Sequence, residues 1–340
     1  MARDKSAIQT WTEYLLARSL TSAIGATDVE TNLRSASRLG SLLYRLDRRH
    51  RERGHAHIRM AFPHWPESRV RRTCEQSLQH LAQLAVEAIQ VPREVHENTW
   101  PQRIELHENL APALEVLNAP GPKILVTGHL GNFEVLGYSM AVIGYDIDAL
   151  ARPLDNPLLS RWLYGIREAK GMRIIDKFNA TDRMTSVIRR DGFLGFIADQ
   201  NAGDRGTYIP FFGKLASTYK SIPLLAMRYQ CPILCGYAHR VGPGFRYEIG
   251  AVDIFGPDDW DSQPDPQYYI AARYNRAFEA MIRRKPEQYF WMHRRWKSRP
   301  RYEREGKAMP ASLRRKLEGL PWMTQEQIDR LIANEGPAIK

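Results

Sequence analysis

Hydrophobic residues recur at helical spacing through the first hundred positions of the chain. Between residues 30 and 49, leucines and arginines fall on opposite sides of a predicted helix at about 100° per residue. A second helix is predicted over residues 68–90, with Ser68 as its N-cap. We therefore expect residues 1–110 to form a helical N-terminal region. The helix over residues 30–49 carries the leucines Leu39, Leu42, Leu43 and Leu46 and the arginines Arg34, Arg38, Arg45, Arg48 and Arg49.

The leucine and arginine pattern has two interpretations. Such a helix can cover the protein's own core, as most amphipathic helices do. It can also lie on an anionic bilayer, with leucines in the interface and arginines at the phosphates. The pattern leaves both open, and we expect the N-terminal region to be partly membrane-associating.

A different pattern begins after the breaker Ala-Pro-Gly-Pro at residues 119–122. A short apolar run at residues 123–127 predicts a buried strand, and residues 133–143 predict a helix. Further strand-like runs, mostly separated by helical patterns, occur at residues 147–151, 172–175, 192–198, 233–238 and 247–252. This alternation predicts an α/β fold, and Gly-Pro-Gly at residues 242–244 predicts a hairpin. We expect a mixed, mostly parallel sheet flanked by helices in an α/β domain over residues 111–305, followed by a C-terminal helical extension over residues 306–340.

Net charge and cysteine content indicate which partners and which cellular compartment to expect. The net charge of +11 attracts acidic partners such as nucleic acid, anionic membrane or an acidic carrier protein. Three scattered cysteines are too few for a disulfide framework and favour a reducing compartment. The chain has no apolar run of about 20 residues and no secretory leader pattern. We therefore expect any membrane contact to be peripheral or monotopic.

The most basic region is residues 281–316, with 13 Lys or Arg against 3 Glu, interleaved with aromatic residues. Its possible partners are an acidic carrier protein, lipid headgroups or solvent. A nucleic-acid-binding protein is the rival interpretation from another functional class.

One short motif, His-Leu-Gly-Asn-Phe-Glu at residues 129–134, suggests chemistry. His129 follows a predicted strand, at the edge where open α/β sheets bind ligands. On one continuous helix His129 and Glu134 would lie about 140° apart, so a bend is needed. Gly131 and Asn132 can supply it. A histidine beside a carboxylate is a good general base, whereas the alternative is a turn histidine and a glutamate favoured by the helix dipole.

Four blocks in order, at residues 129–134, 151–157, 197–200 and 210–218, resemble the bacterial lipid A biosynthesis (lauroyl/myristoyl) acyltransferase family, of the lysophospholipid acyltransferase-like superfamily. The resemblance covers roughly residues 10–300. It implies a glycerolipid-acyltransferase-like fold at the cytoplasmic face of the bacterial inner membrane. It also implies transfer of an acyl chain from an acyl-carrier-protein or CoA thioester to a hydroxyl of a lipid A precursor or related glycolipid, without cofactor or metal.

Roles for individual residues follow from the same resemblance. His129 would be the general base and Glu134 its orienting carboxylate. Arg152 would bind phosphate on the acceptor or donor. Asp199 follows a predicted strand and could position Arg152 or the acceptor, or hold its loop. The other expected substrate contacts are Asn156, Gln200, Phe211, Phe212 and Gly213, and Gly131 and Asn132 are the expected oxyanion donors.

Several of these expectations have alternatives. Asn156 fits a turn residue, and Phe211 and Phe212 fit core packing as well as an acyl-chain surface. The N-terminal stretch at residues 12–26 is short and interrupted by Arg18, which leaves a different lipid or a soluble hydroxyl compound open as acceptor.

Other chemistries fit the sequence less well. Gly-Tyr-Ser-Met-Ala at residues 137–141 loosely matches a serine-hydrolase elbow, but it falls inside a predicted helix. No zinc-binding spacing occurs, so we expect no metal site. A nucleic-acid binder would leave the four motif blocks unexplained, and we expect no nucleic-acid partner.

Overall fold

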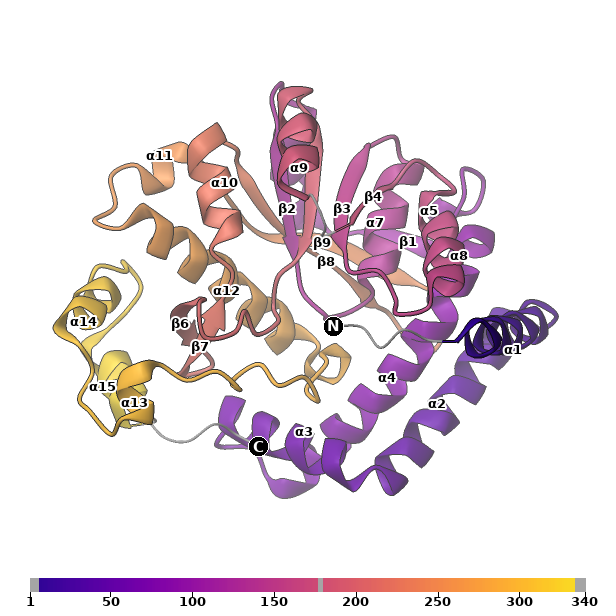
Figure 1. The fold of residues 1–340 in the computed structure, drawn as a ribbon, viewed down its shortest axis with the longest axis horizontal. Coiled ribbons are helices and arrows are strands. Elements are labelled where there is room, and N and C mark those ends of the chain that lie inside the picture. The colour runs from indigo at the N-terminus through magenta and orange to yellow at the C-terminus, as the bar shows by residue number, and fades with distance from the viewer. Residues whose placement is uncertain (1–5, 177–179, 334–340) are drawn as a thin grey trace.

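The computed structural model describes residues 6–176 and 180–333, and a seven-stranded sheet lies at its centre (Figure 1). The pairing of β8 with β9 is antiparallel and the other pairings are parallel, which confirms the predicted mixed, mostly parallel α/β sheet. The strands, in spatial order, are β1 (Ile104–Leu106), β9 (Tyr247–Phe255), β8 (Ile233–Arg240), β2 (Lys123–Thr127), β5 (Phe193–Ile197), β3 (Ile147–Ala151) and β4 (Arg173–Asp176).

Helices connect the parallel strands, as the alternating pattern predicts. The run at residues 123–127 is the buried strand β2, and the hairpin predicted at residues 242–244 joins β8 to β9. The helices beside the sheet are α5 (Trp100–Arg103), α6 (Ala111–Asn118), α7 (Phe133–Val142), α8 (Pro157–Glu168), α9 (Ala180–Arg189), α10 (Ser221–Tyr229) and α11 (Pro257–Trp260).

A second, two-stranded sheet was not predicted. It consists of β6 (Thr207–Phe211) and β7 (Lys214–Thr218), which pair antiparallel across a tight turn at Phe212 and Gly213. Both turn residues have positive φ, of 49° and 69°. All five residues of β7 are buried, so the strand lacks the alternation of buried and exposed positions by which a half-buried strand is identified from sequence.

The N-terminal region is mostly helical, as predicted, but residues 104–106 within its predicted bounds form the edge strand β1. Its helices are α1 (Ala7–Gly25), α2 (Val29–Leu46), α3 (Arg48–Ala61) and α4 (Glu67–Glu94). The predicted N-cap of α4 was wrong by two residues, because Pro66 and not Ser68 precedes the first turn. Among the described residues, no helix has both the length and the apolar character required to cross a membrane.

Helix α2 has three faces. Leu33, Ala36 and Gly40 are buried against α4, where a side chain at Gly40 would meet the Gln79 backbone. The predicted leucine side does not cover the core: its four leucines are between 40% and 72% exposed. Its arginines are also exposed. The leucine face therefore has no partner among the described residues of this chain.

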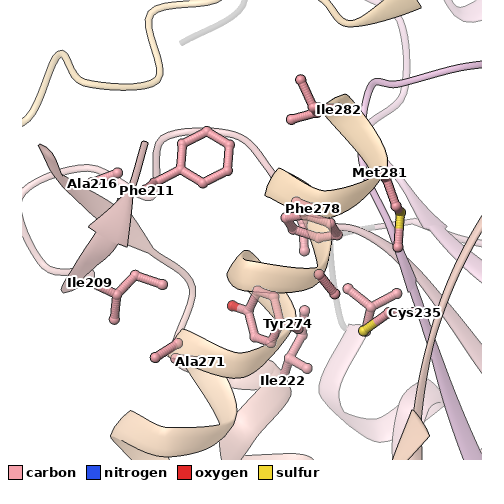
Figure 2. Packing of buried hydrophobic residues seen from close by; sticks show 14 of the residues in the cluster. Ile209, Phe211, Ala216, Ile222, Cys235, Ala271, Tyr274, Phe278, Met281 and Ile282 are labelled. Atoms are coloured by element: carbon pink, nitrogen blue, oxygen red, sulfur yellow. The ribbon is translucent and has the colours of Figure 1, made fainter. Parts of the chain in front are cut away.

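The largest hydrophobic core joins all three predicted segments of the chain. Its centre is α12 (Pro266–Arg284), which lies between Ile209 and Phe211 of the β6–β7 hairpin and Cys235 of β8 (Figure 2). Leu317 and Ile328 of the C-terminal extension are buried in the same cluster. The extension contains α14 (Ala311–Glu318) and α15 (Gln325–Ala333), and the short helix α13 (Arg301–Arg304) precedes it.

Candidate functional site

Two adjacent parallel strands bring His129 and Asp199 together. Thr127 at the end of β2 pairs with Ile197 at the end of β5, and each of the two side chains follows two residues later. His129 Nδ1 lies 2.7 Å from Asp199 Oδ1. The pair thus lies at the carboxyl edge of the sheet, where sequence analysis placed both residues without joining them.

Burial and charge determine how this pair is protonated. The Asp199 side chain is 2% exposed and that of His129 is 25% exposed. Burial opposes a charged imidazole, but the Asp199 carboxylate outweighs it and raises the pKa of His129, with Glu134 contributing. Burial likewise opposes an ionised Asp199, whereas the imidazole lowers its pKa. An ionised Asp199 accepts the Nδ1–H, which leaves the lone pair of His129 on Nε2.

Gln200 and Asn201, which follow Asp199, each contact the imidazole of a histidine. The Gln200 side-chain amide Nε2 lies 3.1 Å from His129 Nε2. The Asn201 backbone N–H donates to His293 Nε2 at 3.1 Å. Burial lowers the pKa of His293 to about 4, so this second imidazole is neutral at physiological pH. His293 was not among the predicted site residues, although it lies inside the region of resemblance and is flanked by aromatic and basic residues.

The segment that carries His293 forms one side of the site. The Phe290 N–H donates to the His129 carbonyl at 3.0 Å, and Gly131 N–H donates to the Gln288 carbonyl at 2.9 Å. Phe133 and Phe290 place their rings 5.3 and 6.3 Å from the His129 ring. An apolar wall thus borders the imidazole.

The bend predicted after His129 is present. Gly131 has φ of 54°, and a Cβ there would lie 2.1 Å from the Ala238 carbonyl oxygen, so only glycine fits. Asn132 contributes as the N-cap of α7, because its side-chain oxygen accepts from the Glu134 and Val135 amides at 3.1 and 3.0 Å.

Glu134 does not orient the imidazole by a hydrogen bond, which corrects the expectation from the motif. Its carboxylate forms a bidentate salt bridge with Arg167 of α8, in which Arg167 Nε lies 2.9 Å from Oε2 and Nη2 donates to Oε1. The side chain is nearly buried. Glu134 therefore ties the first turn of α7 to α8 and acts on His129 only through its charge.

The backbone geometry does not support Gly131 and Asn132 as oxyanion donors. The Gly131 amide donates to Gln288, and the Asn132 amide donates to the Ala238 carbonyl at 2.8 Å. Both N–H groups are thus engaged with backbone carbonyls in this structure. They position the loop against β8 and the 286–291 segment.

A buried polar network lies beneath this loop. The Asn132 side-chain amide donates to Glu87 Oε2 at 2.9 Å, and Arg240 Nη2 donates to the same oxygen at 2.7 Å. Glu87 is fully buried, and burial raises its pKa. His80 Nε2 lies 2.8 Å from the Gly131 carbonyl oxygen. Neither Glu87 nor Arg240 was predicted from the sequence, because their pairing joins helix α4 to strand β8 across the fold.

Arg152 and Asn156 lie on the connection between β3 and α8. The Arg152 side chain is exposed and lies 3.8 Å from Asp155, so Asp199 does not position it. Asn156 is buried and caps α8, and its amide also donates to the Thr10 carbonyl and to Glu13 on α1. Asn156 therefore has the turn role that sequence analysis left open.

Phe211, Phe212 and Gly213 form the end of the β6–β7 hairpin. Both rings are buried; Phe211 lies 5.5 Å from Trp296, and Phe212 lies 5.8 Å from Trp291. The aromatic cluster supports the core-packing alternative rather than an open acyl-chain surface.

Two other candidate chemistries find no site in the described ranges. No group of three or more His, Cys, Asp or Glu side chains within residues 6–176 and 180–333 could hold a metal ion. Ser139 is buried within α7, which confirms that the loose serine motif lies inside a helix.

Comparisons with a family model and with individual known proteins agree on one family. The family of bacterial lipid A biosynthesis acyltransferases matches residues 2–298. The chain is 29% identical to the lipid A biosynthesis lauroyltransferase of Escherichia coli K12, over 44% of this chain and 48% of that protein. It is 25% identical to the palmitoleoyltransferase of the same organism, over 52% and 56%. For the myristoyltransferase the identity is 22%, over 77% and 80%. The chain thus spans about half the length of the first two of these relatives.

Proposed function

Because this chain belongs to the bacterial lipid A biosynthesis acyltransferase family, we propose that it transfers a fatty acyl chain from a thioester to a hydroxyl group of a lipid A precursor or related glycolipid. The observation that carries the proposal is the hydrogen bond between His129 and Asp199 at the carboxyl edge of the sheet. It keeps the proton of the neutral motif histidine on Nδ1 and leaves Nε2 unprotonated, which a general base requires.

The reaction needs no covalent acyl-enzyme. His129 Nε2 takes the proton of the acceptor hydroxyl while its oxygen attacks the thioester carbonyl carbon. The carbon–sulfur bond then breaks, and the leaving thiolate receives the proton from the imidazolium. Asp199 holds Nδ1–H throughout and stabilises the imidazolium, as a carboxylate does in other histidine-based sites.

Gln200 is the residue that the acceptor must displace. Its amide nitrogen lies 3.1 Å from His129 Nε2, at the distance that a hydroxyl oxygen needs in order to give up its proton. When the hydroxyl enters, the amide N–H groups are released beside the reacting carbon. We assign them to the oxyanion, since the loop amides at residues 131 and 132 are engaged elsewhere.

We also propose an acyl donor and a cellular location for the protein. An acyl-carrier-protein or CoA thioester is the donor, and both are acidic partners for a chain of net charge +11. The exposed leucines and arginines of α2 support binding to the surface of an anionic membrane, at the cytoplasmic face of the inner membrane. Exposed apolar residues of α1, Trp11 and Leu20 among them, add to this contact.

The test compares lipids from cells that lack the gene and express wild-type protein or a variant. Mass spectrometry should detect one lipid that gains an acyl chain only with active protein. We expect His129→Ala to lower transfer by about 10²- to 10⁴-fold, the usual contribution of a general base. His64→Ala, at an exposed histidine away from the motif, is the matched control and should retain wild-type transfer.

Asp199→Asn tests the pair itself. In purified protein its rate should fall, because the carboxylate no longer stabilises the imidazolium. The base must be neutral to act, so activity declines as pH falls through the pKa of His129. Since Asp199 raises that pKa, the acid limb should move to lower pH in the variant. Near-wild-type transfer by a folded His129→Ala protein would refute the mechanism.

A further inference from the structure

A cavity of about 300 Å³ lies between α12, the β6–β7 turn and the C-terminal extension. Arg276, Glu279 and Arg283 line it from one face of α12, and Trp322, Arg330 and Leu331 line it from the extension. The family match ends at residue 298, so half of this wall lies outside the matched region. Gly213 lines the cavity, but His129, Asp199 and Gln200, to which we assign the chemistry of acyl transfer, do not.

The C-terminal extension packs against the main core and against α12, and this packing forms the cavity. Leu331 and the nearby Leu317 and Ile328 are buried in the main core. The Trp322 ring lies 5.3 Å from that of Tyr269 on α12. Lys316 pairs with Asp265 at the start of α12 at 2.8 Å.

The lining charge is positive. Three guanidinium groups face one carboxylate, and that carboxylate, Glu279, accepts the Phe212 backbone N–H at 2.7 Å. Glu279 also pairs with Arg283 at 3.4 Å, and burial raises the pKa of Glu279. Arg276 has no carboxylate within ion-pairing distance among the described residues. Within the part of the chain that the structure describes, Arg330 pairs with Glu326 on its own helix and with no other carboxylate.

Aromatic stacking orients two of these cations. The Arg276 guanidinium lies 5.1 Å from the Trp322 ring centre, and that of Arg283 lies 4.9 Å from the Phe212 ring centre. A guanidinium stacked on a ring keeps its N–H edge available for two parallel bonds to a phosphate. Trp322 and Leu331 supply apolar surface beside these edges.

We infer that this cavity binds a phosphate monoester, with Arg276 and Arg330 holding the phosphate and the wall of Trp322 and Leu331 holding an apolar chain attached to it. The ligand is an amphiphile, because neither the cations nor the apolar wall alone accounts for the lining. The inference does not depend on acyl transfer at His129.

The test titrates the intact protein with dihexanoyl phosphatidic acid below its critical micelle concentration, by calorimetry and by tryptophan fluorescence. Parallel titrations use sodium pyrophosphate and dihexanoyl phosphatidylcholine. We expect phosphatidic acid to bind at least tenfold more tightly than phosphatidylcholine, with a fluorescence change that Trp322→Phe removes. We expect phosphatidic acid to bind more tightly than pyrophosphate, because only the lipid has an apolar chain. Equal binding of the two would overturn the role of Trp322 and Leu331 and identify a free phosphate compound as the ligand.

The double variant Arg276→Gln, Arg330→Gln should weaken phosphatidic acid binding at least tenfold. Both side chains are exposed, so the fold should tolerate the change, and thermal unfolding checks this. Arg183→Gln, Arg189→Gln on α9 removes the same charge elsewhere and should leave binding intact. Equal binding by the two double variants, or no binding of either anionic probe, would overturn the inference.

Discussion

Arginine residues behave differently in the segment that follows α12 and on helix α2. In the segment after α12, Arg295 is 1% exposed and donates to the Gln200 and Ser217 carbonyls, to Thr218 and to Asn275. On α2, in contrast, Arg34, Arg38 and Arg45 are exposed to solvent beside a face of exposed leucines. The same residue type thus joins loops in one region and forms a charged surface in the other.

This difference assigns separate roles to the two regions. The buried arginines of the segment, Arg295 and Arg299, hold β7 and the loop after Asp199, whereas most of its other Lys and Arg side chains are exposed. These two guanidinium groups are therefore structural and are not available to a partner. The exposed cations of α2, next to apolar side chains, suit an anionic bilayer.

The largest effect should come from the buried region. Arg295→Ala leaves two backbone carbonyls, a hydroxyl and a side-chain amide without their donor, and unsatisfied buried groups cost about 1–3 kcal/mol each. We expect the free energy of unfolding to fall by at least about 3 kcal/mol. Urea denaturation measures it. Lys297→Ala, two residues away and exposed, should stay within about 0.5 kcal/mol of wild type. Equal stability of the two variants would place Arg295 among the solvent-facing arginines.

Local sequence patterns predicted the central sheet well. Strands β2 and β3 have the predicted bounds, because their apolar runs end at clear breakers. Gly131 was correctly predicted to form the bend after His129, because its backbone has a positive φ, which glycine adopts readily. The β6–β7 hairpin was not predicted, because the fully buried strand β7 shows no alternation of apolar and polar residues. Arg295 was misread as part of a basic surface because charge alone predicts exposure.

The site itself was only half predictable. His129 and Asp199 each follow a strand end, which the sequence indicates, but their pairing depends on β2 lying beside β5. Strand order is a property of the whole fold and not of a local pattern. For the same reason Glu134 was assigned to His129, five residues away, instead of to Arg167 on the next helix.

A smaller effect should come from the apolar half of the α2 surface. Leu39→Ser, Leu42→Ser, Leu46→Ser removes three exposed leucines without touching the α4 contact. If they enter a bilayer, each contributes on the order of 1 kcal/mol, and binding to vesicles should weaken about hundredfold. Vesicles of equal parts phosphatidylglycerol and phosphatidylethanolamine, with a sedimentation readout, measure this. Leu106→Ser, Leu224→Ser, exposed leucines on β1 and α10, serve as the control. Unchanged vesicle binding by the triple variant would exclude α2 as the contact.

The smallest effect should come from the charged half of the same helix. Arg38→Gln, Arg45→Gln removes two exposed cations, each contributing about 1 kcal/mol at an anionic surface, so binding to the same vesicles should weaken about thirtyfold at low salt. Because exposed charges are screened, this loss should shrink as salt rises, whereas the loss from the leucine variant should persist. Arg183→Gln, Arg189→Gln on α9 lowers the net charge equally, at a helix far from α2 in Figure 1. An equal loss in both double variants would mean that the total charge of the protein, rather than the α2 surface, draws it to the membrane.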